Sequence, residues 1–110
     1  MRTIGKEQPS NQMSKRTKAC AITMKVKKIV WERDEQRCIF CHTPYALPEA
    51  HVIPRSKGGL GIEENIITVC RECHNKLDQT DERTWRLPYA KTYLKTHYKD
   101  WDEGKLVYRK

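Results

Sequence analysis

Long apolar runs are absent from this sequence. No stretch approaches the roughly 18 consecutive apolar residues that a membrane-spanning helix needs, so we do not expect a membrane protein. The first 20 residues are polar and basic, and no apolar segment follows their charges, which argues against a secretory signal. These two absences predict a cytoplasmic protein.

Apolar residues are also scarce as material for a core. Only 37% of the 110 residues are apolar and there is a single Phe, whereas 33% are charged. A chain of this length is expected to form one domain. Such a domain buries only roughly two-thirds of the surface that the unfolded chain exposes. Domains with so small a core usually need disulfides or a metal ion. Because the cytoplasm keeps thiols reduced, we interpret the five cysteines as metal ligands plus one spare thiol.

Negative charge is in the minority, and the positive excess of +8 is uneven along the chain. Residues 1–37 hold ten Lys and Arg against four Asp and Glu, residues 38–79 hold four against five, and residues 80–110 hold eight against five. The flanks are therefore basic and the middle is nearly neutral. This pattern is typical of a protein that holds a polyanion with its flanks, and added solubility is the alternative explanation.

The N-terminal part divides into an arm and a helix. Residues 1–20 show no periodicity and contain Gly, Pro and Ser, which predicts a flexible basic arm ahead of a single domain over residues 21–110. Thr23 is a suitable N-cap, and apolar residues recur at helical spacing as far as about Arg33. We therefore expect a short amphipathic helix there, with lysines on its polar side.

The remaining chain mixes strands and helices. Apolar clusters at residues 46–47, 52–53 and 66–69 predict two short strands, and the Gly-containing segment between them must be a loop. A short helix is expected over residues 71–79 and another from Asp81. Pro88 either kinks that last helix or begins a new one.

Two C-x2-C pairs, separated by 28 residues, carry the strongest signal. Four thiolates at about 2.3 Å from one Zn²⁺ make a closed structural site, and binding energies of order 10 kcal/mol then stabilise the fold. The predicted ligands are Cys38, Cys41, Cys70 and Cys73.

Three neighbouring residues fall outside that ligand set. His42 and His74 each follow a cysteine pair, so replacement of one cysteine ligand by either imidazole is the alternative. Cys20 is the odd cysteine, and we interpret it as an incidental or half-buried thiol.

The stretch between and around the cysteine pairs resembles the HNH endonuclease family. The match covers residues 38–79 and includes the signatures H-V-I-P-R-S-x-G-G and N-I-x-x-x-C-x-x-C-H. Small HNH proteins encoded near packaging genes of bacteriophages and prophages are similar beyond this core. The resemblance implies an α+β fold, a small zinc-stapled ββα-metal (His-Me finger) core over about 38–79 with flanking N- and C-terminal helices, the C-terminal extension covering 80–110.

Carried onto this chain, the resemblance implies that His51 is the general base, that Asn65 braces the loop holding it, and that His74 binds a divalent metal. The chemistry agrees, because an imidazole can take a proton from water near neutral pH. A cation such as Mg²⁺ or Mn²⁺ neutralises charge on the phosphate and needs few protein ligands. On its own, a histidine in an apolar strand is more often a structural, half-buried residue.

One position departs from the family pattern. Many members have a metal-binding Asp or His just before the general base, and this chain has Ala50. Asp78 lies four residues after His74, so both side chains project from one helix face and are the favoured ligand pair. Glu49 is a candidate additional ligand. A surface ion pair of His74 with Asp78 is the alternative, and a catalytically lapsed DNA-binding module would follow if no residue fills the role.

Basic residues supply the expected DNA contacts. Arg55 and Lys57 lie beside the proposed base and would contact phosphates. Further phosphate-binding candidates in the arm and first helix are Lys15, Arg16, Lys18, Lys25, Lys27 and Lys28. From the resemblance we expect double-stranded DNA as substrate, nicked or cut on both strands, with terminase subunits as partners in phage DNA packaging inside a bacterial cell.

Overall fold

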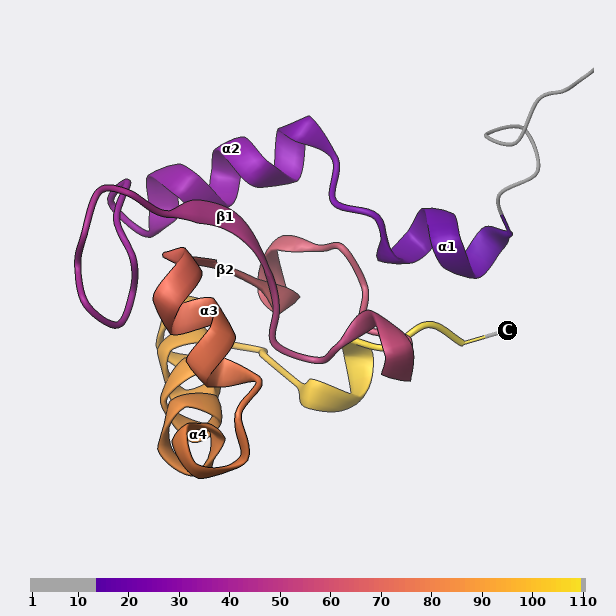
Figure 1. Ribbon diagram of the computed structural model, residues 1–110. Coiled ribbons are helices and arrows are strands. Elements are labelled where there is room, and N and C mark those ends of the chain that lie inside the picture. The colour runs from indigo at the N-terminus through magenta and orange to yellow at the C-terminus, as the bar shows by residue number, and fades with distance from the viewer. Residues whose placement is uncertain (1–13, 110) are drawn as a thin grey trace, which may run out of the picture.

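The computed structural model describes residues 14–109 and has the predicted α+β class (Figure 1). Its elements are α1 (Lys15–Cys20), α2 (Met24–Arg33), β1 (Leu47–His51), β2 (Ile66–Val69), α3 (Arg71–Leu77) and α4 (Thr80–His97). Short 3-10 turns cover Arg55–Lys57, Glu63–Asn65 and Glu103–Lys105. Among the described residues, no helix is both long and apolar enough to cross a bilayer.

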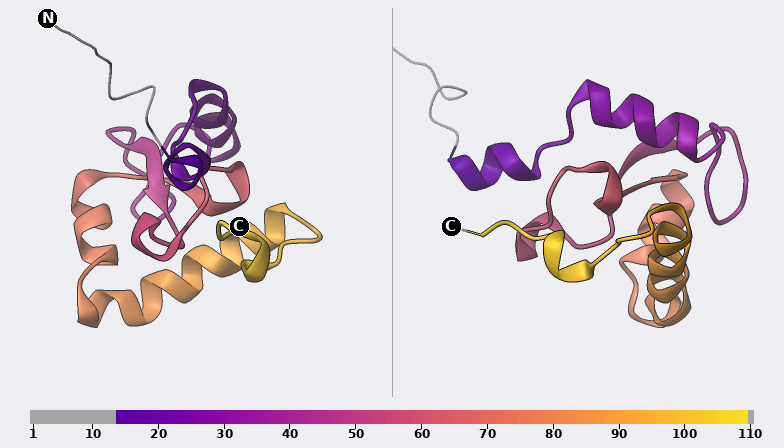
Figure 2. Two further views of the ribbon diagram at one scale, coloured as in Figure 1. Left: turned by 90° about the vertical axis from the view of Figure 1, so that its right-hand side faces the viewer. Right: turned by 180° about the vertical axis from the view of Figure 1, so that it is seen from behind.

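The two strands form an antiparallel pair at the centre of the molecule. Leu47 pairs with Val69 and His51 pairs with Ile66, with an irregularity in the register between Leu47 and Ala50. Every residue of β2 is buried. Figure 2 shows why, because α2 lies on one side of the strands while α3 and α4 lie on the other. The order β1, β2, α3 agrees with the expected ββα core.

Most helix and strand predictions are confirmed, with shifted ends. Thr23 caps α2 by accepting a hydrogen bond from the Val26 amide at 3.2 Å. β1 ends at His51, so the apolar cluster at residues 52–53 is buried just beyond the strand. α4 runs without a break through Pro88, and a second helix therefore does not begin there.

The predicted flexible arm over residues 1–20 does not include its last six residues, which form α1. Ser14 caps this helix by accepting a hydrogen bond from the Thr17 amide at 3.0 Å. Cys20 ends the helix with only 2% of its surface exposed, so the expected half-buried thiol is fully buried. The remainder of the arm, residues 1–13, lies outside the described residues.

A buried carboxylate joins α2, β2 and α4. Asp34, 3% exposed, ends α2 and accepts hydrogen bonds from Arg33 Nε at 2.7 Å, the Thr68 amide at 2.8 Å and Tyr93 Oη at 2.6 Å. Arg33 Nη2 also donates to the Ile66 carbonyl at 2.7 Å. A buried charge with this many partners is costly to disturb, because its removal leaves the Thr68 amide without a hydrogen-bond acceptor and Arg33 without its ion-pair partner.

Substitution Asp34→Ala is therefore expected to lower the free energy of unfolding by about 3–5 kcal/mol, the range for removing one member of a buried ion pair. Denaturant unfolding of the zinc-loaded protein, followed by circular dichroism, measures the loss. Glu32→Ala is the matched control, since this carboxylate is exposed on the same helix, and it should change stability by less than about 0.5 kcal/mol. A loss for Asp34→Ala as small as the control's would contradict the assignment.

Candidate metal centre and catalytic cavity

The four predicted cysteine ligands converge at one point. Their Sγ atoms all lie within 4.8 Å of one another, and Cys41 Sγ is 3.6 Å from Cys70 Sγ. Four sulfurs at 2.3 Å from a central ion would lie about 3.8 Å apart. The donor set and its spacing therefore fit a zinc ion, with Cys38, Cys41, Cys70 and Cys73 as ligands. His42 and His74 are not members of the group.

Local structure explains why the cysteines meet. The Cys38 carbonyl accepts a hydrogen bond from the His42 amide at 2.9 Å, which closes the first pair into a tight turn. Cys70 is the N-cap of α3, and its Sγ accepts from the Cys73 amide at 3.4 Å. The first pair is tied to β2 by the Ile39 amide, which donates to the Thr68 carbonyl at 3.0 Å.

Charge at the cluster favours a bound cation. Burial raises the pKa of the Cys38 thiol, but backbone hydrogen bonds from Cys41 and Cys70 outweigh it and lower this pKa to about 7. Burial and the neighbouring sulfurs raise the pKa of Cys73. All four thiolates can thus form together only when a positive ion offsets their mutual repulsion.

Arg86 supplies a fixed positive charge next to this cluster. Its Nε donates to Glu82 Oε1 at 3.0 Å, and its guanidinium lies 4.4 Å from the Trp85 ring centroid and 5.0 Å from that of Phe40. Burial lowers the pKa of Arg86, but hydrogen bonds with Glu82 and Cys73 raise it more. Four thiolates around one Zn²⁺ carry a net negative charge, which this buried guanidinium partly balances.

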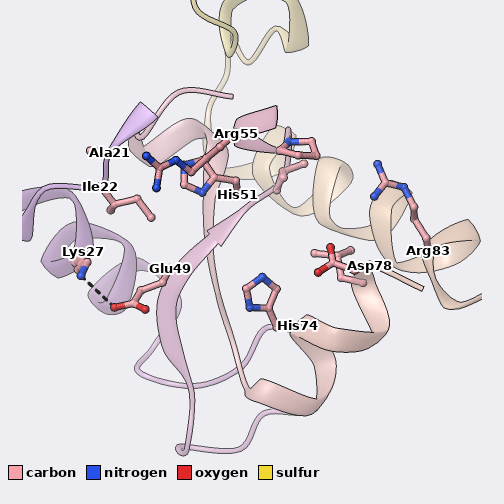
Figure 3. A pocket seen from close by; sticks show the side chains of 12 residues that line it. Ala21, Ile22, Lys27, Glu49, His51, Arg55, His74, Asp78 and Arg83 are labelled. Carbon is pink, nitrogen blue, oxygen red and sulfur yellow. Dashed lines mark ion pairs between the residues drawn. The ribbon is translucent and has the colours of Figure 1, made fainter. Parts of the chain in front are cut away.

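Several of the predicted catalytic residues meet in a second place, a cavity of about 620 Å³ (Figure 3). It lies between the end of β1, the turn at Arg55, α3, the beginning of α4 and the linker from α1 to α2. The linker contributes Ala21 and Ile22 to its lining. The charged and histidine side chains that line it are Lys27, Glu49, His51, Arg55, His74, Asp78 and Arg83.

The hydrogen bond of His51 determines which of its ring nitrogens carries the hydrogen. Nε2 lies 2.8 Å from the Cys20 carbonyl, and because a carbonyl only accepts, Nε2 carries the hydrogen. Nδ1 then keeps its lone pair. Burial lowers the pKa of His51 below 6.5, the bond to Cys20 opposes this shift, and the charges of Arg55 and His74 lower the pKa further. The ring is therefore neutral at neutral pH.

The end of α1, which carries the Cys20 carbonyl, and the linker after it lie close to Gly61 and to the turn at Arg55. The Gly61 amide donates to the Ala19 carbonyl at 2.9 Å, and a Cβ at Gly61 would lie 2.1 Å from the Ala21 oxygen. Arg16 Nη2 donates to the carbonyls of Arg55 and Ser56, both at 3.1 Å. Only glycine at position 61 leaves room for the linker to reach His51.

Asn65 lies behind the cavity and is fully buried. Its Oδ1 accepts from the Ile53 amide at 2.8 Å, and its Nδ2 donates to the carbonyls of Ile53 at 3.2 Å and Leu60 at 2.8 Å. The side chain thus ties together both ends of the loop that follows His51. Both Oδ1 and Nδ2 of Asn65 are hydrogen-bonded in this way. The conformation of this loop therefore depends on Asn at position 65.

The candidate ligands of a catalytic metal border the cavity from two sides. His74 projects from α3 and Asp78 follows the end of that helix, while Glu49 lies opposite on β1 and pairs with Lys27 at 3.0 Å (Figure 3). Ala50 is buried in the apolar core. Within residues 14–109, the cysteines alone converge to the spacing of a complete ligand set. Hydrated Mg²⁺, by contrast, is commonly held by one or two protein groups.

The predicted DNA contacts are dispersed. Arg55 and Lys27 line the cavity, and Lys57 lines an adjoining groove that also includes Arg83. The Arg16 side chain is engaged with the loop at Arg55. The remaining predicted lysines are exposed away from the cavity lining: Lys15, Lys18, Lys25 and Lys28.

Three groups next to the cavity or the cysteine cluster were not predicted from the sequence. The Cys20 carbonyl is a backbone group, which leaves no trace in residue type. Arg83 and Arg86 lie on α4 among other charged residues, and only the packing of this helix against α3 reveals their positions. The i,i+4 spacing of Glu82 and Arg86 was the one available sign of the latter pair.

Comparison with protein-family models matches residues 38–86 to the model described as HNH endonuclease. The matched segment contains all four clustered cysteines together with His51, Asn65, His74 and Asp78. It does not contain Cys20, whose carbonyl contacts His51, or Lys27, which lines the same cavity as His51. Neither the curated proteins nor the solved structures contain a significant match to this chain.

Proposed function

We propose that this protein is a metal-dependent DNA endonuclease that hydrolyses phosphodiester bonds, because residues 38–86 match the HNH endonuclease model. One observation carries the proposal: a neutral His51, with its free Nδ1 fixed by the Cys20 carbonyl, borders the same cavity as His74 and Asp78. A general base, candidate metal ligands and cationic side chains are the groups that phosphodiester hydrolysis requires.

His51 performs the proton transfer in this proposal. Its Nδ1 takes a proton from a water molecule as the water oxygen bonds to phosphorus, and the bond from phosphorus to the leaving oxygen breaks. The resulting imidazolium keeps its Nε2 hydrogen bond to the Cys20 carbonyl at 2.8 Å, which favours the charged form. The leaving oxygen then takes a proton from solvent.

The remaining charged groups hold the phosphate. A divalent ion such as Mg²⁺ or Mn²⁺ would be held by His74 and Asp78, with Glu49 as an added ligand, and when bound it would neutralise charge on the phosphate and leaving oxygens. Arg55 and Arg83 border the cavity from two further directions and would contact the non-bridging oxygens. The Lys27 ion pair keeps Glu49 from repelling the substrate.

Substrate binding is expected to be electrostatic and weakly selective for sequence. The exposed lysines of α1 and α2, with Lys57 in the turn after β1, would neutralise backbone phosphates of double-stranded DNA. From the resemblance alone, the proposal also includes phage origin, terminase partners during DNA packaging, and the cytoplasm of a bacterial host.

A second candidate is a zinc-binding module that binds DNA without cutting it. Ala50 favours this alternative, because its buried methyl group occupies the position that in many family members provides a metal ligand. Incubating supercoiled plasmid with the zinc-loaded protein and Mg²⁺, Mn²⁺ or Ni²⁺ distinguishes the endonuclease from the DNA-binding module. Nicking with any of these metals supports the enzyme, whereas binding without nicking under all of them supports the module.

Asp78→Asn should lower the nicking rate roughly 10- to 100-fold and raise the metal concentration needed, because it removes a charged metal ligand. Titration of Mn²⁺ in the plasmid assay measures both effects. Asp81→Asn is the matched control, since this exposed carboxylate lies three residues on and does not line the cavity. If Glu49→Gln reproduces the loss and Asp78→Asn does not, the ligand assignment passes to Glu49.

A further inference from the structure

Two large apolar side chains stand exposed at the beginning of β1. Tyr45 has 87% and Leu47 has 60% of its surface exposed. We call this pair the Tyr45–Leu47 ledge. Among the described residues, the other exposed large apolar side chains are Met24, Trp85 and Tyr89, and the last two pack with Phe40 in an aromatic cluster.

The ledge borders a cavity that shares lining residues with the cavity of His51. This second cavity, of about 520 Å³, is lined at one end by Pro44, Tyr45 and Leu47. At its other end it shares Glu49 and His74 with the cavity of His51. A molecule whose phosphate lies beside His51 would therefore extend along β1 onto the ledge.

The backbone beneath the ledge is fixed. The Tyr45 amide donates to Thr43 Oγ1 at 3.3 Å, and the Thr43 carbonyl accepts from the Cys38 amide at 2.9 Å. Cys38 is itself one of the four clustered cysteines. An aromatic ring on so restrained a backbone loses little conformational entropy when a ligand stacks on it.

Polar neighbours indicate what the ledge binds. Arg71 and Asn75, both exposed on α3, line the same cavity. The acidic Glu49 is paired with Lys27, so the cavity does not repel an anion. An aromatic face, an arginine and an amide side chain together are suited to a base, a phosphate and a polar base edge.

A protein partner fits the ledge less well. A buried aromatic side chain contributes roughly 150–250 Å², so Tyr45 and Leu47 together provide only about half of the roughly 800 Å² per partner of a stable interface. The apolar surface is thus of the size of a nucleobase with its sugar.

We propose that the Tyr45–Leu47 ledge is a nucleobase subsite, an inference that rests on the proposed endonuclease function. Tyr45 stacks on one base near the scissile phosphate and Leu47 contacts its sugar, while Arg71 binds a flanking phosphate. Bases inside a duplex have both faces covered, so Tyr45 can stack only on a base that is unpaired or displaced. The preferred substrate is therefore DNA with a bulge, flap or unpaired end next to the cleavage position.

The test uses His51→Ala protein, so that DNA stays intact, and duplexes carrying 2-aminopurine in a single-nucleotide bulge. Binding should quench the fluorescence of this base through stacking. Adding Tyr45→Ala should abolish the quenching and remove the preference for bulged over fully paired DNA, an expected affinity loss of roughly tenfold for the bulged duplex. Tyr45→Phe, which keeps the ring, should retain both.

Met24→Ala is the matched control, because this side chain is also exposed but lines neither cavity. Equal quenching and equal affinities for the His51→Ala protein with and without Tyr45→Ala would overturn the subsite. So would a concentration-dependent dimer in sedimentation that Tyr45→Ala disrupts, because the ledge would then bind a second copy. Absence of plasmid nicking by the wild-type protein, with Tyr45-dependent quenching intact, would overturn the endonuclease function and leave the subsite supported.

Discussion

Cys70→Ala is expected to leave the protein largely unfolded at room temperature. Structural zinc contributes roughly 10–16 kcal/mol of binding free energy in small domains, and this energy is coupled to folding. Typical domains have a net stability of only about 5–15 kcal/mol. Cys70 also caps α3, so its removal affects the helix that carries His74. Circular dichroism and the zinc content measured with a chromogenic chelator provide the readouts.

Cys20→Ala is the control for that experiment. Cys20 is buried, as Cys70 is, but lies outside the cluster. The substitution keeps the backbone carbonyl that contacts His51, so zinc content and fold should both be retained. A Cys70→Ala protein that keeps the wild-type spectrum and unfolding midpoint in excess chelator would contradict the zinc assignment.

His51→Ala should reduce plasmid nicking by roughly 10²- to 10⁴-fold while leaving the zinc-loaded fold intact, because it removes the proposed general base. The base acts in its neutral form, so the wild-type rate should rise with pH through the His51 pKa. Burial, followed by the charges of Arg55 and His74, holds this pKa below 6.5. The rate should therefore already exceed half of its plateau value at pH 6.5.

The imidazole of His97 offers a matched control. It is exposed near the end of α4, with Nδ1 2.9 Å from the Tyr93 carbonyl, and lines neither cavity next to β1. His97→Ala should keep the wild-type rate and pH profile between pH 5 and 8. A His51→Ala protein with the same rate and the same profile as the wild type would rule out this residue as the base.

Much of the metal centre was predictable because it depends on local spacing. Two residues between cysteines suffice to close each turn, and the four ligands then meet wherever β2 and α3 bring the turns together. His51, His74 and Asp78 were also predictable, since a strand end and one helix face define where their side chains point. These three residues share a cavity with Glu49 and Lys27 because α2 packs against β1. The sequence pattern does not predict that packing.

The unpredicted features depend on contacts between distant segments. α1 has only six residues, and its helical pattern is too short for periodicity to detect. The continuous course of α4 through Pro88 reflects packing of Ala90 and Leu94 into the core, which offsets the lost hydrogen bond at proline. Asp34 looked like an ordinary charged residue at a helix end, yet it is the buried centre of a polar network.

The contact between the linker and Gly61 also bears on how the segment that contains His51 can be transferred between proteins. A segment cut to residues 38–86 would retain every motif residue and all four cysteines, but not the Cys20 carbonyl that fixes the His51 ring. The His51 ring would then be free to rotate, and either of its two nitrogens could face the cavity. A graft or fusion partner that is to preserve the orientation of the base must therefore begin no later than Ser14, the cap of the helix that delivers this carbonyl.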